Sequence, residues 1–229
     1  CDALILNPLT SENLVPALGD APAPILDVGP KCDPVLVRDI ARYHPIRVAD
    51  FEEQGVLAAE AVLSGLSSPG EGWAILIAGF CGARQSDGRC RGALRTLRRV
   101  FPAERILTVH ADFDRGSARS ALRVLAGRLD VRAVFCANDE LALGLIRAMH
   151  EQGRRVPGDV SVVGFDGFDV GEYSFPPLTT VRQDFRRHGR EMVGLVLEQV
   201  ASGVRDGSRS IIIPTELILR GSTAPPPAA

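Results

Sequence analysis

Short apolar runs alternate with amphipathic segments along most of this chain. Between Ala133 and Gly167, two such runs flank a segment in which Leu141, Leu145 and Met149 recur at helical spacing. Apolar runs without polar alternation are typical of strands that are covered on both faces. A strand–helix–strand unit of this kind places its strands in parallel, with a right-handed crossover. The pattern therefore predicts an α/β fold built on parallel sheet.

The same alternation continues on both sides of this unit. The other predicted strands are Asp2–Asn7, Ala23–Gly29, Trp73–Phe80, Arg105–Phe113 and Ser210–Arg220. The other predicted helices are Asp50–Leu66, Arg91–Val100, Ser117–Leu129 and Asp184–Ala201. Two features favour two lobes. The units fall into groups on either side of 79–82, and Pro176–Gln183 is predicted to be an extended, proline-led connector without an apolar strand. A single seven-stranded sheet is the alternative that the pattern leaves open.

The composition narrows the class of protein. The chain has 229 residues, of which 45% are hydrophobic, enough to bury one large core or two modest ones. Its net charge of −2 indicates neither a basic surface for nucleic acid nor a membrane-binding patch. No apolar run approaches the roughly 18–20 residues of a membrane span. The five cysteines are odd in number and form no C-x-x-C pair, so we expect reduced thiols in a cytoplasmic protein.

Several of the predicted strands end in acid or amide residues. These residues are Asn7, Asp27, Asn138, Asp139 and Asp166. In open parallel sheets, ligands bind outside the carboxyl ends of the strands, so these side chains are expected to converge. Asp and Asn are also common turn formers and helix caps, which leaves both roles open for each residue, although a cap is favoured for Asp139. As a set, such donors and acceptors suit the hydroxyl groups of a polyol, sugar or nucleoside.

Three further side chains could complete such a site. Arg89 follows the loop after the strand Trp73–Phe80, where a guanidinium could orient and partly neutralise carboxylates, although a surface position is the ordinary alternative. Phe113 and Phe185 could form apolar walls for a ring, or they could belong to the core.

Enzyme motifs are missing from the sequence. It contains no H-E-x-x-H, no G-x-S-x-G and neither of the common glycine-rich phosphate loops. The four histidines show no metal-ligand spacing. Paired carboxylates could act as acid and base, but nothing identifies a nucleophile. We therefore expect no enzyme activity, no cofactor and no metal.

The second half of the chain carries a specific family resemblance. The stretch AVFCANDELALGLIRAMHEQGRRVPGDVSVVGFDG, followed by PPLTTVRQDF and PTELILRGST, resembles the effector-binding core of the LacI/GalR family of bacterial transcriptional regulators. The resemblance extends from Asp2 to about Thr223. It implies the periplasmic-binding-protein type I fold: two Rossmann-like α/β lobes with parallel sheets and a small effector bound between them.

The resemblance also implies a set of effector contacts and lobe boundaries. The contacts would be Asn7, Asp27, Arg89, Phe113, Asn138, Asp166 and Phe185, with Gln183 near the effector. The first lobe would comprise 1–81 and 183–208 and would lack the family's opening βαβα, the second would comprise 82–182 and 209–223, and 224–229 would form a disordered tail. GARQSDG lacks the pattern of any one effector class.

The implied partners are a small effector, DNA and a second copy of the chain. The effector would be a sugar or related polyol, or a nucleoside, and operator DNA would be bound only through a helix-turn-helix that this sequence does not contain. The helix Glu140–Gln152 agrees with a homodimer, because its apolar residues spread over more than one narrow face and part of them would be exposed in a monomer. These residues are Leu141, Leu143, Leu145, Ile146 and Met149. Burial of that helix on two sides within its own lobe is the alternative. A sugar-binding protein of a transport system and an enzyme acting on a sugar or nucleoside are the competing functions.

Overall fold

The computed structural model divides the chain into two compact units, which are described separately. Unit 1 comprises Cys1–Asp50, Ala83–Gln85 and Asp184–Pro214, and unit 2 comprises Phe51–Gly82, Ser86–Gln183 and Thr215–Ala229. The structure describes residues 2–6, 18, 23–28, 43–46, 49–66, 68, 70–125, 130–202 and 211–224.

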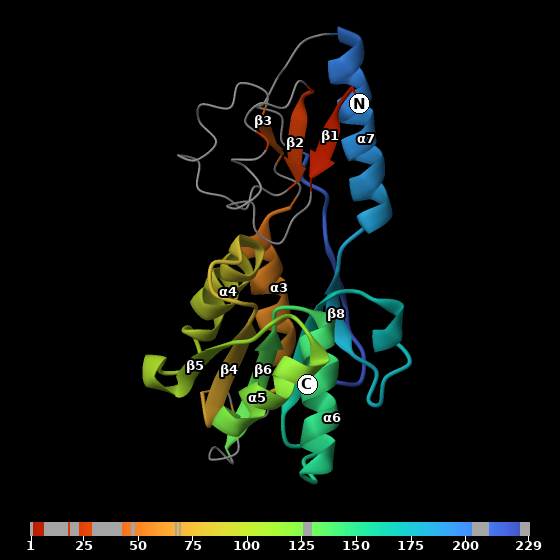
Figure 1. The fold of residues 1–229 in the computed structure, drawn as a ribbon. Helices are drawn as coiled ribbons and strands as arrows, with labels where there is room; N and C mark the ends of the chain where they lie inside the picture. Colours follow the sequence, from red (N-terminus) through yellow and green to blue (C-terminus); the bar gives the residue numbers. More distant parts are fainter. Residues whose placement is uncertain are drawn as a thin grey trace. The chain divides into compact units, whose positions relative to one another are not determined.

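Unit 2 is built on a six-stranded sheet in the order β5-β4-β6-β7-β8-β9. Figure 1 labels β5, β4, β6 and β8 of this sheet. The strands are β4 (Trp73–Ala78), β5 (Ile106–His110), β6 (Val131–Cys136), β7 (Ser161–Asp166), β8 (Thr179–Arg182) and β9 (Glu216–Ile218). All neighbouring pairs are parallel except β8 and β9, which are antiparallel. The carboxyl ends of β6 and β7 therefore lie next to each other at one edge of the sheet.

Helices cover both faces of this sheet. They are α3 (Phe51–Ser64), α4 (Arg84–Leu97), α5 (Arg115–Leu125) and α6 (Asp139–Glu151). Of two short 3-10 turns, η1 (Ala103–Arg105) lies between α4 and β5, and η2 (Asp169–Gly171) lies between β7 and β8. One core cluster packs α5 and α6 against the sheet, and a second packs α3 and α4 against it. Burial on both faces explains why β6 and β7 carry apolar residues without alternation.

The described residues of unit 1 include a smaller parallel sheet and a helix at its side. Strands β1 (Leu4–Leu6), β2 (Ile25–Val28) and β3 (Tyr43–Ile46) pair in that order. The helix α7 (Phe185–Ser202) packs through Met192 and Leu195 against Leu26 of β2. Ile25 and Tyr43 form a separate cluster.

The fold confirms the predicted α/β class with mostly parallel sheet, and the two separate sheets rule out a single seven-stranded sheet. The expected boundary at residue 81 differs from the structure, in which α3 and β4 belong to unit 2. The reason is that β4 lies between β5 and β6 and pairs with both. An apolar run shows that a strand is buried but does not show which sheet contains it.

The segment predicted to be a connector is extended and leads from unit 2 into unit 1 and α7, as expected. The expectation that it holds no strand is wrong, because it contains the buried strand β8. Thr179 and Thr180 of β8 are fully buried, and both hydroxyl groups are hydrogen-bonded. Polar side chains can occupy a central strand when their hydrogen bonds are satisfied in this way. Of the expected tail 224–229, all but Ala224 lies outside the described residues. Among the described residues, no helix is both long and apolar enough to span a bilayer.

Candidate functional site

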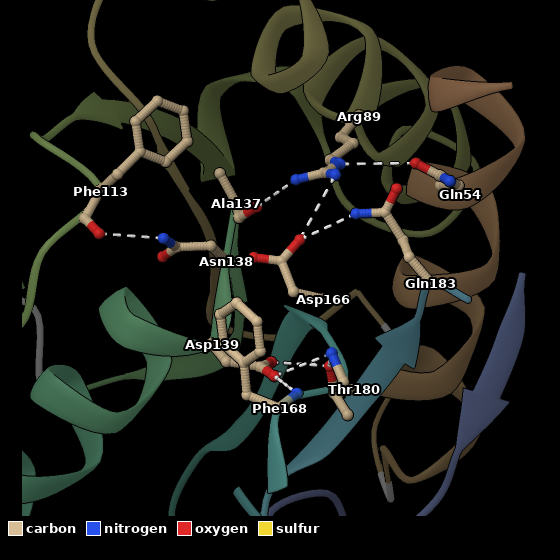
Figure 2. Close-up of polar contacts among 11 residues, drawn as sticks. Gln54, Arg89, Phe113, Ala137, Asn138, Asp139, Asp166, Phe168, Thr180 and Gln183 are labelled. Atoms are coloured by element: carbon tan, nitrogen blue, oxygen red, sulfur yellow. Dashed lines mark hydrogen bonds and ion pairs between the residues drawn. The ribbon is translucent and has the colours of Figure 1, made fainter. Parts of the chain in front are cut away.

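The turn between β6 and α6 connects several parts of the site. Asn138 is the N-cap of α6: its Oδ1 accepts a hydrogen bond from the Leu141 N–H at 2.9 Å. Its Nδ2 donates to the Phe113 carbonyl oxygen at 2.9 Å (Figure 2). The expectation that Asp139 caps this helix is wrong, because Asn138 fills that position. Both ends of the buried Asn138 side chain are therefore used within the protein.

Asp166 ends β7 in an unusual backbone conformation. Its φ is 109°, in a region that side chains other than glycine rarely adopt. Its Oδ1 accepts a hydrogen bond from Gln183 Nε2 at 3.0 Å and lies 3.6 Å from Arg89 Nη2. The side chain is 15% exposed. Within the described part of the chain, Oδ2 has no hydrogen-bond partner, which leaves one carboxylate oxygen available to a ligand (Figure 2).

Arg89 lies in α4, not in a loop, and its guanidinium is buried. Nη1 donates to the Ala137 carbonyl oxygen at 2.8 Å, and Nε donates to Gln54 Oε1 at 3.5 Å. The guanidinium carbon lies 3.5 Å from the centre of the Phe165 ring, a cation–π contact. These contacts fix the plane of the guanidinium beside Asp166.

Burial shifts the protonation equilibria of this pair. It raises the pKa of Asp166 to about 6, against the effect of the nearby Arg89 charge, which lowers it; the Asp139 charge raises it further. Burial also lowers the pKa of Arg89 to about 10, so Arg89 remains protonated at neutral pH. The site thus combines a fixed cation with a carboxylate that is ionised at pH 7. A hydroxyl group could donate to the carboxylate and accept from a guanidinium or amide N–H.

Phe113 lies beside this cluster with its backbone in the left-handed region, at φ 53°. Its ring meets the Phe80 ring edge to face, with 5.4 Å between the centroids. The ring also covers Gly79, where a Cβ atom would lie 1.9 Å from Phe113 Cζ. Gly79 thus makes room for an aromatic wall at this edge of the sheet.

The remaining predicted contacts belong to unit 1. Asp27 is completely buried and accepts a hydrogen bond from the Tyr43 hydroxyl. Phe185, at the start of α7, is 47% exposed and meets the His188 ring edge to face. Asn7 lies outside the described residues. Of the eight predicted contacts, unit 2 holds Arg89, Phe113, Asn138, Asp166 and Gln183.

Two residues of the site were missed in the sequence analysis. Gln54 binds Arg89, and Phe165 stacks on it. Gln54 lies on the buried face of α3 together with Ala58, Ala61 and Val62. A lone amide at helical spacing with apolar residues was the signal that could have found it. No metal site was found: within the described ranges, no three His, Cys, Asp or Glu side chains group as a metal ion would require.

Comparisons with known proteins find transcriptional regulators among the proteins that this chain resembles. The family described as "Periplasmic binding protein-like domain" matches residues 74–223, well over half of the chain. The HTH-type transcriptional regulator reg1 of Streptomyces lividans is 39% identical over 145 residues, which cover 61% of this chain and 41% of that protein. The HTH-type transcriptional regulator MalR of Streptomyces coelicolor is 41% identical over 124 residues, covering 54% of this chain and 36% of that protein. The chain thus matches less than half the length of these curated relatives.

Solved structures of regulators share the fold. A LacI family transcriptional regulator from Enterococcus faecalis with bound ribose aligns with a TM-score of 0.81 at 22% identity, covering 98% of this chain and 78% of that one. A CelR–cellobiose complex gives 0.80 at 28% identity, with coverages of 96% and 65%. The lac repressor dimer bound to operator and an anti-inducer gives 0.76 at 26% identity, with coverages of 97% and 74%.

Proposed function

We propose that this chain, which belongs to the LacI/GalR family of periplasmic binding protein-like domains, is the effector-sensing core of a transcriptional regulator. The observation that carries the proposal is the set of polar side chains at the carboxyl ends of β6 and β7. There Arg89 and Gln183 flank a mostly buried Asp166 whose Oδ2 has no partner among the described residues. All three lie within the matched range 74–223.

The effector is proposed to be a neutral sugar or related polyol, with a nucleoside as the other member of the same chemical class. A hydroxyl group can donate to Asp166 Oδ2, while neighbouring hydroxyl oxygens accept from Arg89. Phe113 offers an apolar wall for the ring. The bound ribose and cellobiose named for two structural relatives support a small carbohydrate as the first compounds to test.

Isothermal titration calorimetry against a panel of sugars and nucleosides tests this proposal. We expect micromolar-range binding of at least one neutral polyhydroxyl compound, and we expect Asp166→Asn, which keeps the shape but removes the charge, to weaken it. Binding restricted to phosphorylated or strongly anionic compounds would contradict the proposal, because such ligands would be repelled by Asp166.

Regulation would follow from differential binding. An effector can shift a conformational equilibrium only by the difference between its affinities for the two states. The relatives reg1 and MalR are named HTH-type transcriptional regulators. We propose that effector binding changes operator affinity in the regulator to which this core belongs. A DNA-binding titration with and without effector measures that change; equal operator affinities would contradict it.

We also propose that the core forms a homodimer through one face of unit 2. A groove of about 520 Å³ lies between α5, α6 and the segment after β7, and its apolar or neutral lining includes Leu143, Val170, Tyr173 and Ser174. Its other lining residues are Gly116, Gly144 and three arginines, Arg115, Arg119 and Arg147, which form ion pairs with Glu140 and Glu151. Tyr173 is 84% exposed. The other apolar residues of α6 named above (Leu141, Leu145, Ile146 and Met149) are buried in the core of their own unit, so only Leu143 remains for such a contact. The surface is small, but exposed apolar groups gathered beside a groove commonly mark contacts.

The dimer is tested by sedimentation at micromolar concentration. Leu143→Glu should shift the protein toward the monomer, because a carboxylate would be buried against apolar groups. Val193→Glu, on the exposed side of α7, is the matched control and should leave the association unchanged. An unchanged dimer in Leu143→Glu would contradict this face as the contact.

A further inference from the structure

Asp139 is a second carboxylate close to Asp166, and it is completely buried. Its Oδ2 accepts from the N–H groups of Gly167 at 2.9 Å and Phe168 at 2.8 Å. Its Oδ1 accepts from the Thr180 hydroxyl at 2.7 Å (Figure 2). These bonds lead from the first residue of α6 to β8 and to the two residues that follow Asp166. Asp139 therefore ties three elements together at the edge where the effector is proposed to bind.

The segment held by Asp139 has an unfavourable backbone conformation. The φ angles of Asp166 and Gly167 are 109° and 79°. A non-glycine residue such as Asp166 is strained in this region, and the conformation persists only where the surroundings impose it. The surroundings here are the two N–H bonds to Asp139, a 3.2 Å bond from Gly167 N–H to Thr180 Oγ1, and the bond from Gln183 N–H to the Asp166 carbonyl oxygen.

The strand beside Asp139 leaves room for its carboxylate. A Cβ atom at Gly164 would lie 2.4 Å from Asp139 Oδ1 and 2.9 Å from Leu178 Cδ2. Only glycine at this point of β7 allows the carboxylate to reach Thr180. The sequence thus provides both the anchor and the space that the anchor occupies.

We infer that Asp139 is a positioning residue for effector binding: it holds the turn after β7 so that the Asp166 carboxylate faces the effector beside Arg89. The inference rests on the proposed function. Asp139 has no exposed surface with which to touch a ligand, and its oxygens are engaged with Gly167, Phe168 and Thr180. It acts on the ligand through Asp166.

Ala137 and Asn138, which precede Asp139 in the same turn, also hold residues of the proposed site in place. The Ala137 carbonyl oxygen accepts from Arg89, and Asn138 Nδ2 donates to the Phe113 carbonyl oxygen. Each of the consecutive residues 137, 138 and 139 thus fixes a different residue of the proposed site. Asp139 differs from the other two because it is charged and because it anchors the backbone of a strained turn rather than a side chain or a single carbonyl.

The test compares variants that remove the anchor with one that keeps its shape. Asp139→Ala removes every bond from the carboxylate. Asp139→Asn can still accept from both N–H groups through its Oδ1 and donate to the Thr180 hydroxyl oxygen through its Nδ2. Thr180→Val removes one partner of the carboxylate and also the 3.2 Å bond from the Gly167 N–H to Thr180 Oγ1. Ser222→Ala is the matched control, because Ser222 bridges the Val162 carbonyl of β7 and the Thr179 N–H of β8 away from Asp166.

Two readouts on the full chain separate positioning from a structural role. Hydrogen exchange at the amides of Gly167 and Phe168 reports the anchor without any ligand. Titration with ribose, cellobiose and adenosine reports binding. We expect Asp139→Ala to exchange faster at both amides and to bind at least about tenfold more weakly, as when an outer partner of a ligand-binding group is lost. Asp139→Asn and Ser222→Ala should bind within about threefold of wild type, and Thr180→Val should fall between.

Each outcome has a distinct meaning. Unchanged exchange at Gly167 and Phe168 in Asp139→Ala would overturn the inference, and so would faster exchange with unchanged affinity. If Asp139→Ala does not fold, Thr180→Val tests the inference through ligand titration and through exchange at Phe168, whose N–H bonds to Asp139 and not to Thr180. Weaker binding with faster exchange at Phe168 would support the inference, and unchanged values would overturn it. Wild-type protein that binds none of the probes would contradict the proposed function and with it the positioning role, while the exchange rates would still show whether Asp139 anchors the turn.

Discussion

The end of β6 and the end of β7 lie side by side, and each presents an aspartate, but the two carboxylates differ in how much of their hydrogen-bonding capacity is used. Asp139 is 0% exposed. Its two oxygens accept from three donors: the N–H groups of Gly167 and Phe168 after β7 and the Thr180 hydroxyl of β8. Asp166 is 15% exposed and accepts one hydrogen bond. A saturated carboxylate shapes the protein, whereas one with a spare oxygen can bind a ligand.

The pKa shifts show the same contrast. Burial raises the pKa of both groups. For Asp139 the opposing effects come from hydrogen bonds donated by the Thr180 hydroxyl and by backbone N–H groups. For Asp166 the largest opposing effect is the charge of Arg89, and its pKa settles at about 6. The pKa of Asp166 therefore depends on Arg89, a side chain that the ligand would also contact.

The largest expected effect is that of removing the carboxylate with the spare oxygen. Asp166→Ala should abolish effector binding, a loss beyond about a hundredfold, because a charged hydrogen bond to the ligand is lost and the positive charge of Arg89 is left without its carboxylate. The same substitution should lower the free energy of unfolding by less than about 2 kcal/mol, because burial already disfavours the ionised carboxylate in the folded protein. Calorimetry and thermal unfolding measure the two. A strong loss of stability with binding intact would mean that Asp166 is structural, like Asp139.

A substitution at Gly164 should disturb the hydrogen bonds of Asp139 and leave the side chain of Asp166 unchanged. Gly164→Ala places a methyl group 2.4 Å from Asp139 Oδ1, so the carboxylate or β7 must move. We expect a loss of about 1–3 kcal/mol in the free energy of unfolding, measured by chemical denaturation. Gly189→Ala in α7 is the control, because nothing lies within 4 Å of its added Cβ. Equal stabilities for the two variants would show that Asp139 is not held as tightly as its contacts indicate.

The affinity for the effector should change with pH as the Asp166 carboxyl group ionises. Its pKa is raised from 3.8 to about 6, with Arg89 and Asp139 as the charged neighbours. The carboxyl is therefore ionised at pH 7 and mostly protonated at pH 5, where affinity should be about tenfold lower. The sign for stability is opposite: a raised pKa favours the fold at low pH, and that contribution is lost as pH rises through 6. Titrations of wild type and Asp166→Asn between pH 5 and 8 measure this; a flat wild-type profile would count against it.

The smallest effect is expected at Gln183. Gln183→Leu removes the neutral donor to Asp166 Oδ1, so the pKa of Asp166 should rise further and affinity at pH 7 should fall roughly threefold to tenfold. Gln183→Glu should bind more weakly than Gln183→Leu, because it brings a second negative charge to the Asp166 carboxylate. Calorimetry at pH 7 and pH 8 compares them. The opposite order of the two variants would contradict the proposed geometry.

Local patterns predicted much of the fold and the position of the site. Apolar runs identified β4, β6 and β7, because strands buried on both faces lack polar alternation. The parallel order brings the carboxyl ends of β6 and β7 to one edge, so Asn138 and Asp166 could be expected near each other before any coordinates were known. These conclusions follow from periodicity and strand direction, which are properties of short segments.

Contacts between distant segments could not be predicted in the same way. Whether β4 joins the first or second sheet depends on pairing with β5 and β6, and β8 is buried in spite of its threonines because Thr180 bonds to Asp139. Asp139 was expected to cap α6, but its partners lie 28 to 41 residues away along the chain. The sequence determined by itself where strands end in carboxylates. Only the tertiary structure decided which carboxylate is saturated and which is left for a ligand, because a hydrogen bond depends on which groups meet in space.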